Sequence, residues 1–241
     1  MNGNMLKIGA LATVDGILSG RIVQAMLERG VAIDAVLVDP ATIKARDLRV
    51  HEQRTGGRLP VLPLPERPPR FYVSDHNGAD CLELVRSLEL DLLVNAGTPR
   101  IVDTVLLHAA PMGVLNCHPG RLPDYRGACA VEHAVMNDEP VANTLHRMTE
   151  GVDEGPVLMI EDVPLNEVTC YRDLRCAVYR HGFDLLASAV LELQQGRLGE
   201  ADFTAQGDGG WGTPVGDDVI EEIERRLSTG RYTPLIEAVR A

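Results

Sequence analysis

The amino-acid sequence predicts an α/β fold, in which helices cover both faces of a mostly parallel, doubly wound sheet and a short C-terminal appendage follows. Short apolar runs, of the length of buried strands, recur along the first half of the chain. Between these runs, apolar residues repeat at the spacing of one helix face. This alternation is typical of parallel sheets, in which ligands gather at the carboxyl ends of the strands.

The expected elements follow from the same two patterns. A strand at 6–12, a helix over 17–27 that closes before Gly30, and a strand at 35–38 form one strand-helix-strand unit. Residues 41–70 are rich in Pro and contain two adjacent Gly, so we expect a mobile excursion without helix or strand. The later patterns predict strands at 71–73, 90–94, 113–116, 144–148 and 157–163, and helices at 79–88, 101–108, 130–137, 171–194 and 219–227.

Length and charge limit the classes of protein. The 241 residues include 23 Lys and Arg against 35 Asp and Glu, a formal net charge of −12. The phosphate-neutralising charge of a nucleic-acid-binding protein is therefore missing, and we expect no nucleic-acid partner. With 45% hydrophobic and 24% charged residues the composition is globular. We expect a catalytic domain at 1–196 and a C-terminal extension at 197–241 that packs on it.

The chain carries no obvious membrane or export signal. No apolar run reaches the roughly 18 residues that span a bilayer, and the N-terminus is polar. The five cysteines are odd in number and irregularly spaced, which is typical of reduced thiols, and no metal-ligand pair such as C-x-x-C occurs. We expect a cytoplasmic protein without a membrane partner or a bound metal. The oligomeric state stays open, with a homodimer among the alternatives.

Polar side chains with reactive groups are most concentrated in two segments. Asn116 and His118 come directly after a strand expected to be central in the sheet. An amide and an imidazolium are both suited to donate hydrogen bonds to a developing oxyanion. Asp153 lies in an acidic, glycine-containing turn downstream, from which its carboxylate could reach His118. The three together are what acyl transfer to an amine needs, since the carboxylate can orient the ring and accept a proton.

These two segments resemble the folate-dependent formyltransferases. The run NCHPGRLPDYRG at 116–127 is similar to that family's N-x-H-x-S-L-L-P-x-x-R/K-G signature. The sequences TLH at 144–146 and GVDEGPVL at 151–158 resemble its T-x-H and G-x-D-x-G-P-I-L block. The resemblance covers 90–193 closely, and 6–38 only in the order of strand and helix.

The resemblance implies a Rossmann-like fold and transfer of a formyl group from 10-formyltetrahydrofolate to a primary amine, without a metal. It places the catalytic residues at Asn116, His118 and Asp153. It also implies that the folate rests against the loop after the fourth strand and against the acidic turn, and that the first loop, 12–20, faces the amine. The residues expected to bind the folate are Thr98, Pro99, Arg100, Ile101, Gly151 and Val152, and those expected to bind the amine are Thr13, Asp15, Gly120, Arg121 and His146.

Two positions depart from the family's pattern. Gly120 stands where the family usually has Ser, and we expect this change to open the floor of the site. Arg121 replaces an apolar residue, and its cation could contact a phosphate or carboxylate of the acceptor. Both departures bear on the acceptor rather than on the reaction.

Several of these residues also have plain structural interpretations. His118 and His146 could be hydrogen-bonded core residues, Asp153 could form a local turn, and Trp211 could anchor the tail instead of stacking on a ring. We interpret Cys117 and Cys129 as small buried thiols. Five basic residues form either solvated surface or a contact for an anionic acceptor: Lys44, Arg46, Arg49, Arg54 and Arg58.

The preferred acceptor is a small molecule, an amino-sugar nucleotide. We see in the chain neither the C-terminal barrel that is typical of the family's initiator-tRNA enzymes nor the glycine-rich first loop of its purine-pathway members. One alternative is a 10-formyltetrahydrofolate hydrolase, although the additional N-terminal domain of such enzymes is not seen. Others are a formyltransferase for a glycinamide ribonucleotide-like or other metabolite amine, and a silent folate- or nucleotide-binding module.

Overall fold

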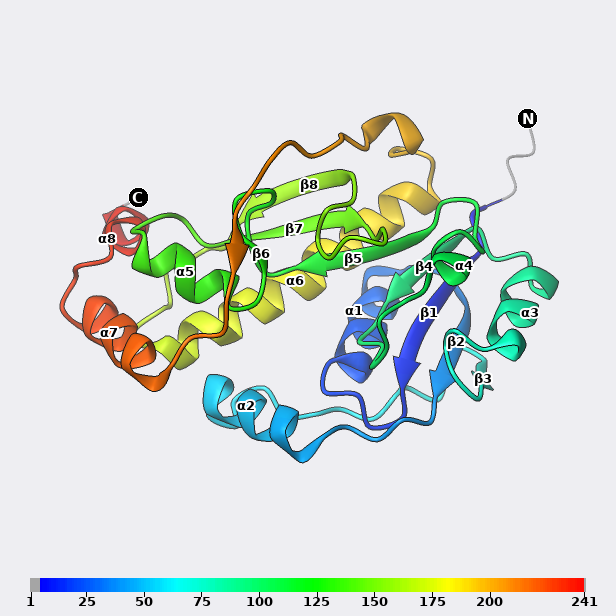
Figure 1. Cartoon of the computed structure of the whole chain (residues 1–241), viewed down its shortest axis with the longest axis horizontal. Coiled ribbons are helices and arrows are strands. Elements are labelled where there is room, and N and C mark those ends of the chain that lie inside the picture. The colour runs from blue at the N-terminus through cyan, green and yellow to red at the C-terminus, as the bar shows by residue number, and fades with distance from the viewer. Residues whose placement is uncertain (1–4, 241) are drawn as a thin grey trace.

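A computed structural model describes residues 5–240 and is built on a seven-stranded sheet (Figure 1). Its strand order is β3-β2-β1-β4-β5-β7-β8, with β1 to β5 parallel and β7 and β8 antiparallel. The predicted fold class is confirmed. The strands are β1 (Ile8–Thr13), β2 (Ile33–Asp39), β3 (Arg70–Tyr72), β4 (Leu92–Asn95), β5 (Val114–His118), β7 (Ala142–Arg147) and β8 (Val157–Asp162).

Helices lie on both faces of this sheet because β1 is apolar on both sides. Ile8, Ala10 and Ala12 pack in one core cluster with α1 and α6. Leu11 points to the opposite face, into a cluster with residues of α3 and α4. The helices are α1 (Ser19–Arg29), α2 (Ala45–Thr55), α3 (Ala79–Ser87), α4 (Thr104–Leu107), α5 (Ala130–Met136), α6 (Tyr171–Gln194), α7 (Asp217–Ser228) and α8 (Thr233–Arg240).

The expectation that 41–70 lacks secondary structure was wrong over α2. This helix is mostly polar and buries only His51 and Thr55, so its sequence shows no apolar periodicity to reveal it. It ends at Gly56, whose φ of 59° is the left-handed conformation of a helix C-terminus. The proline-rich segment that follows is irregular, and the side chain of Arg70 holds it by donating to the carbonyls of Leu64 and Pro65.

The predicted long helix is confirmed at its full length as α6, and it connects the two halves of the sheet. It packs against α1, α2 and β7. At its end, Gln194 donates to the carbonyls of Leu6 and Ala32 and accepts from the backbone N–H of Ala32. This helix therefore spans the molecule beneath the carboxyl ends of β4 and β5, where a ligand is expected.

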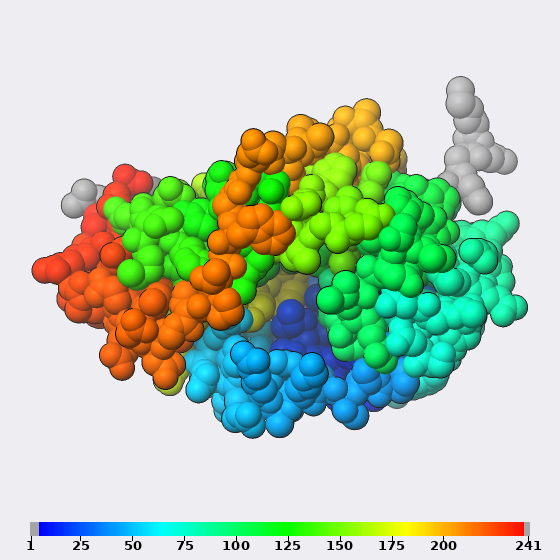
Figure 2. Space-filling view, viewed as in Figure 1, coloured from blue at the N-terminus to red at the C-terminus, as the bar shows by residue number. Residues whose placement is uncertain are grey.

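The C-terminal tail crosses the molecule as a strap, drawn in orange in Figures 1 and 2. Its strand β9 (Trp211–Gly212) pairs in parallel with β6 (Arg126–Gly127). Nearer the sheet, Thr204 forms a bridge with Val157. Figure 2 also shows a hollow between this strap and the segment that contains α2, with atoms of N-terminal residues at its floor. No helix within 5–240 is long and apolar enough to cross a membrane.

Candidate active site

The two predicted reactive segments meet beside the middle of the sheet. Strand β5 extends two residues beyond the predicted end, so Asn116 and His118 lie within the strand and not after it. The antiparallel neighbour β7 sets His146 directly opposite Asn116. The turn after β7 then returns Asp153, whose backbone adopts a left-handed φ of 56°, to the same place. Asp tolerates this conformation better than most residues because its short side chain bonds locally.

The amide of Asn116 is held in one orientation by two neighbours. Its Oδ1 accepts a hydrogen bond of 2.9 Å from Asn95 Nδ2, and its Nδ2 lies 3.0 Å from Nε2 of His146. Because Nδ1 of His146 faces the carbonyl of Arg147 at 3.1 Å, Nδ1 carries the ring proton and Nε2 accepts from Asn116. Within 5–240 one N–H of the amide therefore stays unbonded. Asn95, which holds this amide, was not among the predicted site residues.

His118 and Asp153 form a buried pair. Nδ1 of His118 lies 3.3 Å from Oδ2 of Asp153, and the Asp153 Oδ1 lies 3.5 Å from Nε2 of His146. The other ring nitrogen of His118, Nε2, donates to the carbonyl of Tyr125 at 2.7 Å. Both ring nitrogens thus face protein atoms. Neither is left for a hydrogen bond to a ligand, so His118 can act on one only indirectly, through Asp153.

Burial and the neighbouring polar groups together set the pKa values of this pair. Burial lowers the pKa of His118 below the usual value, although the Asp153 carboxylate and the Tyr125 carbonyl act to raise it. For Asp153, burial acts to raise the pKa, but the nearby imidazoles of His146 and His118 and the backbone N–H of Gly127 outweigh it, and the pKa is lowered. At neutral pH the site therefore holds a carboxylate beside a neutral imidazole, and not the imidazolium expected from the sequence.

A residue of the tail supports the turn that carries Asp153. The Nε2 of Gln206 donates to the carbonyls of Asp153 and Gly155, at 2.9 and 2.6 Å. Its Oε1 accepts from Nε and a terminal nitrogen of Arg126, at 3.2 and 3.0 Å. The backbone N–H of Gly127 donates to the carboxylate itself at 2.9 Å. Sequence reasoning missed Gln206 because nothing in the tail resembles a motif.

One pocket opens on the folate side expected from the sequence. It has a volume of about 180 Å³ and lies between the loop after β4 and the turn at 149–153. Arg100, Ile101, Gly151 and Val152, four of the six predicted folate contacts, line it together with Asn116, His146 and Asp153. Ile101 and Val152 are largely exposed, at 88% and 56%, so the pocket presents an apolar rim. A concave site that combines apolar surface with convergent polar groups is typical of small-molecule binding.

The other two predicted folate contacts do not line this pocket. Pro99 is exposed, and the hydroxyl of Thr98 instead pairs with Nδ1 of the buried His76 at 2.6 Å. Arg100 also has a structural role, since its guanidinium makes a two-pronged bond to the buried Asp39 at 2.8 and 3.1 Å. These contacts connect the loop after β4 to the end of β2 and hold its shape.

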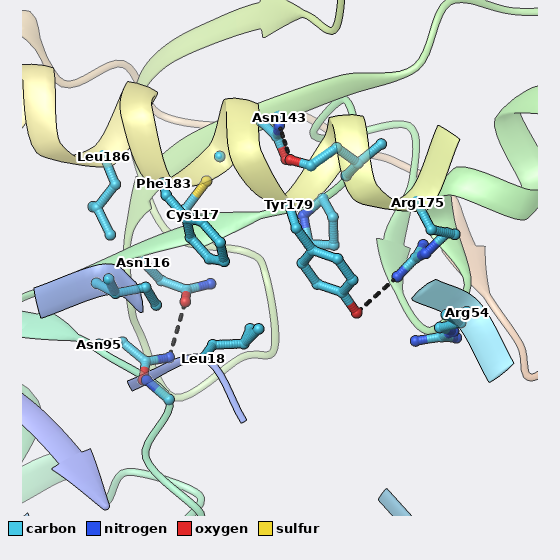
Figure 3. A pocket seen from close by; sticks show the side chains of 15 residues that line it. Leu18, Arg54, Asn95, Asn116, Cys117, Asn143, Arg175, Tyr179, Phe183 and Leu186 are labelled. Carbon is cyan, nitrogen blue, oxygen red and sulfur yellow. Dashed lines mark hydrogen bonds between the residues drawn. The ribbon is translucent and has the colours of Figure 1, made fainter. Parts of the chain in front are cut away.

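A second pocket, of about 270 Å³, lies on the other side of Asn116 (Figure 3). It is bounded by α1, α2 and α6, and its walls are mainly apolar, with Leu18, Ile22, Val178, Phe183 and Leu186. Figure 3 places Asn116 and Asn95 at one end, and Arg54, Arg175 and Tyr179 at the other. Asn116 lines both pockets.

Four of the five predicted acceptor contacts line neither pocket: Thr13, Asp15, Gly120 and Arg121. Thr13 is buried and bonds through its backbone N–H to Ser19, whereas Asp15 is exposed. The first loop reaches the site through Leu18 instead. Arg121 forms an ion pair with Asp162, at the far end of β8.

The open floor expected at Gly120 does not exist. A Cβ atom there would lie 2.6 Å from that of Ala130 and 2.8 Å from Nε2 of His118. Gly120 is needed because the chain packs tightly behind the histidine. Cys117 is only half-buried and lines the second pocket, and burial still raises the pKa of its thiol to about 12, which disfavours the reactive thiolate.

Comparison with known proteins identifies the family. The sequence profile described as "Formyl transferase" matches residues 6–190. The chain belongs to the formyl transferase family. The predicted resemblance is therefore confirmed. The matched range contains every residue that lines the two pockets.

The proteins that are similar to this chain are named for different formyl acceptors. The chain is 33% identical over 171 residues to a methionyl-tRNA formyltransferase of Granulibacter bethesdensis, covering 70% of this chain and 54% of that protein. The chain thus spans about half the length of that relative. Its fold is similar to glycinamide ribonucleotide transformylase 1 of Symbiobacterium toebii, with TM-score 0.58, 24% identity, and coverage of 86% and 96%. It is also similar to a sugar N-formyltransferase of a Shewanella species, with TM-score 0.54, 18% identity, and coverage of 86% and 76%.

Proposed function

We propose that this protein transfers a formyl group from 10-formyltetrahydrofolate to a primary amine of a small molecule. The observation that carries the proposal is that Asn116 lines two pockets at once, one on each side of its amide. A transferase needs its two substrates to meet at one group. The pocket beside 149–153 suits the folate, and the pocket beside α6 suits the amine.

In the proposed reaction, the unbonded N–H of Asn116 donates to the formyl oxygen. The neutral amine attacks the formyl carbon and forms the new C–N bond, and the carbonyl oxygen becomes an oxyanion that this N–H stabilises. Because Asn95 and His146 already hold the amide, it needs no reorientation as charge develops. Asn116 is thus the proposed oxyanion donor.

Asp153 and His118 handle the proton. The attacking amine gains a positive charge and gives one proton to the Asp153 carboxylate. The lone pairs of Asp153 Oδ2 and His118 Nδ1 face each other across 3.3 Å, so one added proton turns a repulsion into a hydrogen bond. When the C–N bond to the folate breaks, the pair returns that proton to the leaving nitrogen. The reaction therefore conserves protons and needs no covalent intermediate.

The preferred acceptor remains an amino-sugar nucleotide, because the net charge of −12 disfavours a tRNA-sized polyanion and the fold is shared with a sugar N-formyltransferase. The sequence similarity to a methionyl-tRNA formyltransferase favours a second candidate, an aminoacyl-tRNA. We further propose that 1–196 form the catalytic domain and 197–241 an extension packed on it, which the contacts of Gln206 support.

The test follows release of tetrahydrofolate by absorbance. Incubation with 10-formyltetrahydrofolate alone measures hydrolysis, and addition of an amino-sugar nucleotide or of methionyl-tRNA measures transfer to each acceptor. We expect release that depends on the amino-sugar nucleotide and a loss of at least about 100-fold in kcat for Asp153→Asn. Release without any amine would indicate a hydrolase, and release only with methionyl-tRNA would replace the acceptor. Equal turnover by Asp153→Asn would contradict the assigned role.

A further inference from the structure

The end of the acceptor pocket that lies away from Asn116 holds a cluster of buried charges with no part in formyl transfer. Arg175 of α6 is 2% exposed, and its NH1 lies 3.4 Å from Oε1 of Glu132. Arg54 of α2 approaches the same carboxylate oxygen at 3.8 Å. The hydroxyl of Tyr179 accepts from Arg175 at 3.1 Å, and Tyr171 donates to Glu132 at 2.5 Å.

This cluster has one more positive than negative charge. Burial acts to raise the pKa of Glu132, but the two arginines outweigh it and the pKa is lowered, so Glu132 is ionised. Two guanidinium groups then face one carboxylate. Among the described residues no Asp or Glu lines the pocket, so no side chain there neutralises the second cation. Arg54, the cation farther from Glu132, is three-quarters buried, and an anionic ligand in the pocket would offset the cost of burying its charge.

The cluster also has hydrogen-bonding capacity to spare. Within 5–240, the buried Nε of Arg175 has no hydrogen-bond partner, nor does Oε2 of Glu132. The hydroxyl of Tyr179 uses its oxygen to accept from Arg175, so its own proton remains for another acceptor. Arg54 is a quarter exposed and lines the pocket, so a ligand there can reach its guanidinium. Arg54, the Nε of Arg175 and the hydroxyl of Tyr179 are donors that an oxyanion would complement, whereas Oε2 of Glu132 is an acceptor.

The structure separates Arg54 from the other basic residues of its segment. Arg58 pairs with Asp173 on the exposed side of α6. Lys44, Arg46 and Arg49 are exposed and line none of the pockets beside α6. Of the five basic residues for which the sequence left a role open, only Arg54 faces the acceptor pocket.

We propose that the formyl acceptor carries an oxyanion, a carboxylate or a phosphate, and that Arg54, Arg175 and Tyr179 bind it while the amine lies beside Asn116. The apolar walls between the two ends enclose the body of the molecule. This inference rests on the proposed function, because it assumes that the pocket receives the amine. It names the feature by which the site selects its acceptor.

Binding to the full-length protein without folate tests the oxyanion site separately from transfer. Titration calorimetry compares two matched pairs, phenethylamine with phenylalanine, and glucosamine with glucosamine 6-phosphate. The variant is Arg54→Gln, which removes the charge from a residue that is not fully buried. The matched control is Arg49→Gln, which removes an exposed charge from the same helix. Thermal melting checks that both variants fold.

We expect the anionic member of at least one pair to bind more tightly than its partner without the anionic group, by about 10-fold or more. A hydrogen bond to a charged group contributes a free energy of this size. Arg54→Gln should abolish this preference and Arg49→Gln should keep it. A preference for phenylalanine would identify the oxyanion as a carboxylate, and a preference for glucosamine 6-phosphate would identify it as a phosphate. Equal binding of both members, no binding of either, or a preference that survives Arg54→Gln would overturn the oxyanion site.

The transfer assay separates the two proposals. Equal transfer to neutral and anionic amines would keep the proposed function and overturn the oxyanion site. Arg54-dependent binding of an anionic probe without transfer to any amine would overturn the function and support the oxyanion site.

Discussion

His118 Nδ1 and Asp153 Oδ2 face each other at 3.3 Å, the imidazole buried and the carboxylate partly exposed, and each has a second partner that fixes its direction. The carbonyl of Tyr125 holds the far side of the imidazole, and the N–H of Gly127 holds the carboxylate. This pair is thus one proton short of a hydrogen bond when the imidazole is neutral. In the proposed reaction this arrangement accepts a single proton and returns it, which is the proton handling that formyl transfer to an amine requires.

The orientation of Asn116 predicts two different mutational effects. Asn116→Ala removes the proposed oxyanion donor, and we expect kcat to fall about 100- to 1000-fold. Asn95→Ala leaves the donor but frees the amide to rotate, so we expect a smaller loss, of about 10-fold. Steady-state kinetics with saturating donor checks both values. Activity of Asn95→Ala below that of Asn116→Ala would show that Asn95 has a role of its own.

The lowered pKa of His118 predicts the direction of the pH dependence. We expect kcat to fall only as the pH drops through the folded pKa of His118, which burial holds below its ordinary value, because protonation of His118 removes the proton acceptor. The stability changes in the same direction, since the folded protein binds this proton more weakly than the unfolded chain. Asp153 has a lowered pKa as well, so the stability it contributes above its unfolded pKa of about 3.8 is lost only in stronger acid. A kcat that rises between pH 7 and 5 would instead support an imidazolium mechanism.

Gln206 predicts that the tail contributes to catalysis. Gln206→Leu removes both donors to the turn of Asp153, and we expect a stability loss of about 2 kcal/mol and a fall in kcat. The control is Gln195→Leu, an exposed glutamine beyond α6. The pH dependence of kcat should also shift in Gln206→Leu, because the carboxylate moves relative to His118. A lower melting temperature with unchanged kcat and pH profile would reduce Gln206 to a structural residue.

Gly120 predicts that the family's usual serine is not tolerated here. In Gly120→Ser the new Cβ would press on Ala130, on Nε2 of His118 and on the carbonyl of Tyr125, all within 2.9 Å. We expect a loss of about 1–3 kcal/mol from overpacking and a displaced histidine. Gly199→Ser is the control, since a Cβ there meets no atom within 4 Å. Chemical denaturation measures both, and equal stability of the two variants would contradict the packing argument.

Much of the fold could be predicted because strands and helices with an apolar face leave a periodic pattern. Helix α6 follows the predicted bounds, and β1 and β2 lie within two residues of theirs at both ends. Helix α2 was missed because it buries almost nothing apolar. The end of β5 was placed two residues too early, at Asn116, because a polar residue such as His118 does not look like a strand position although the backbone still pairs with β7.

The sequence by itself determined the fold class and the family, because both depend on residues close together in the chain: local periodicity and two short motifs. Only the tertiary structure decided how the site works. Asn95, Arg54 and Gln206 lie far from either motif, and strand order, the crossing of α2 over α6 and the path of the tail bring them in. The charge of His118 was likewise decided by burial, which depends on the whole packed chain and leaves no mark on the residues beside it.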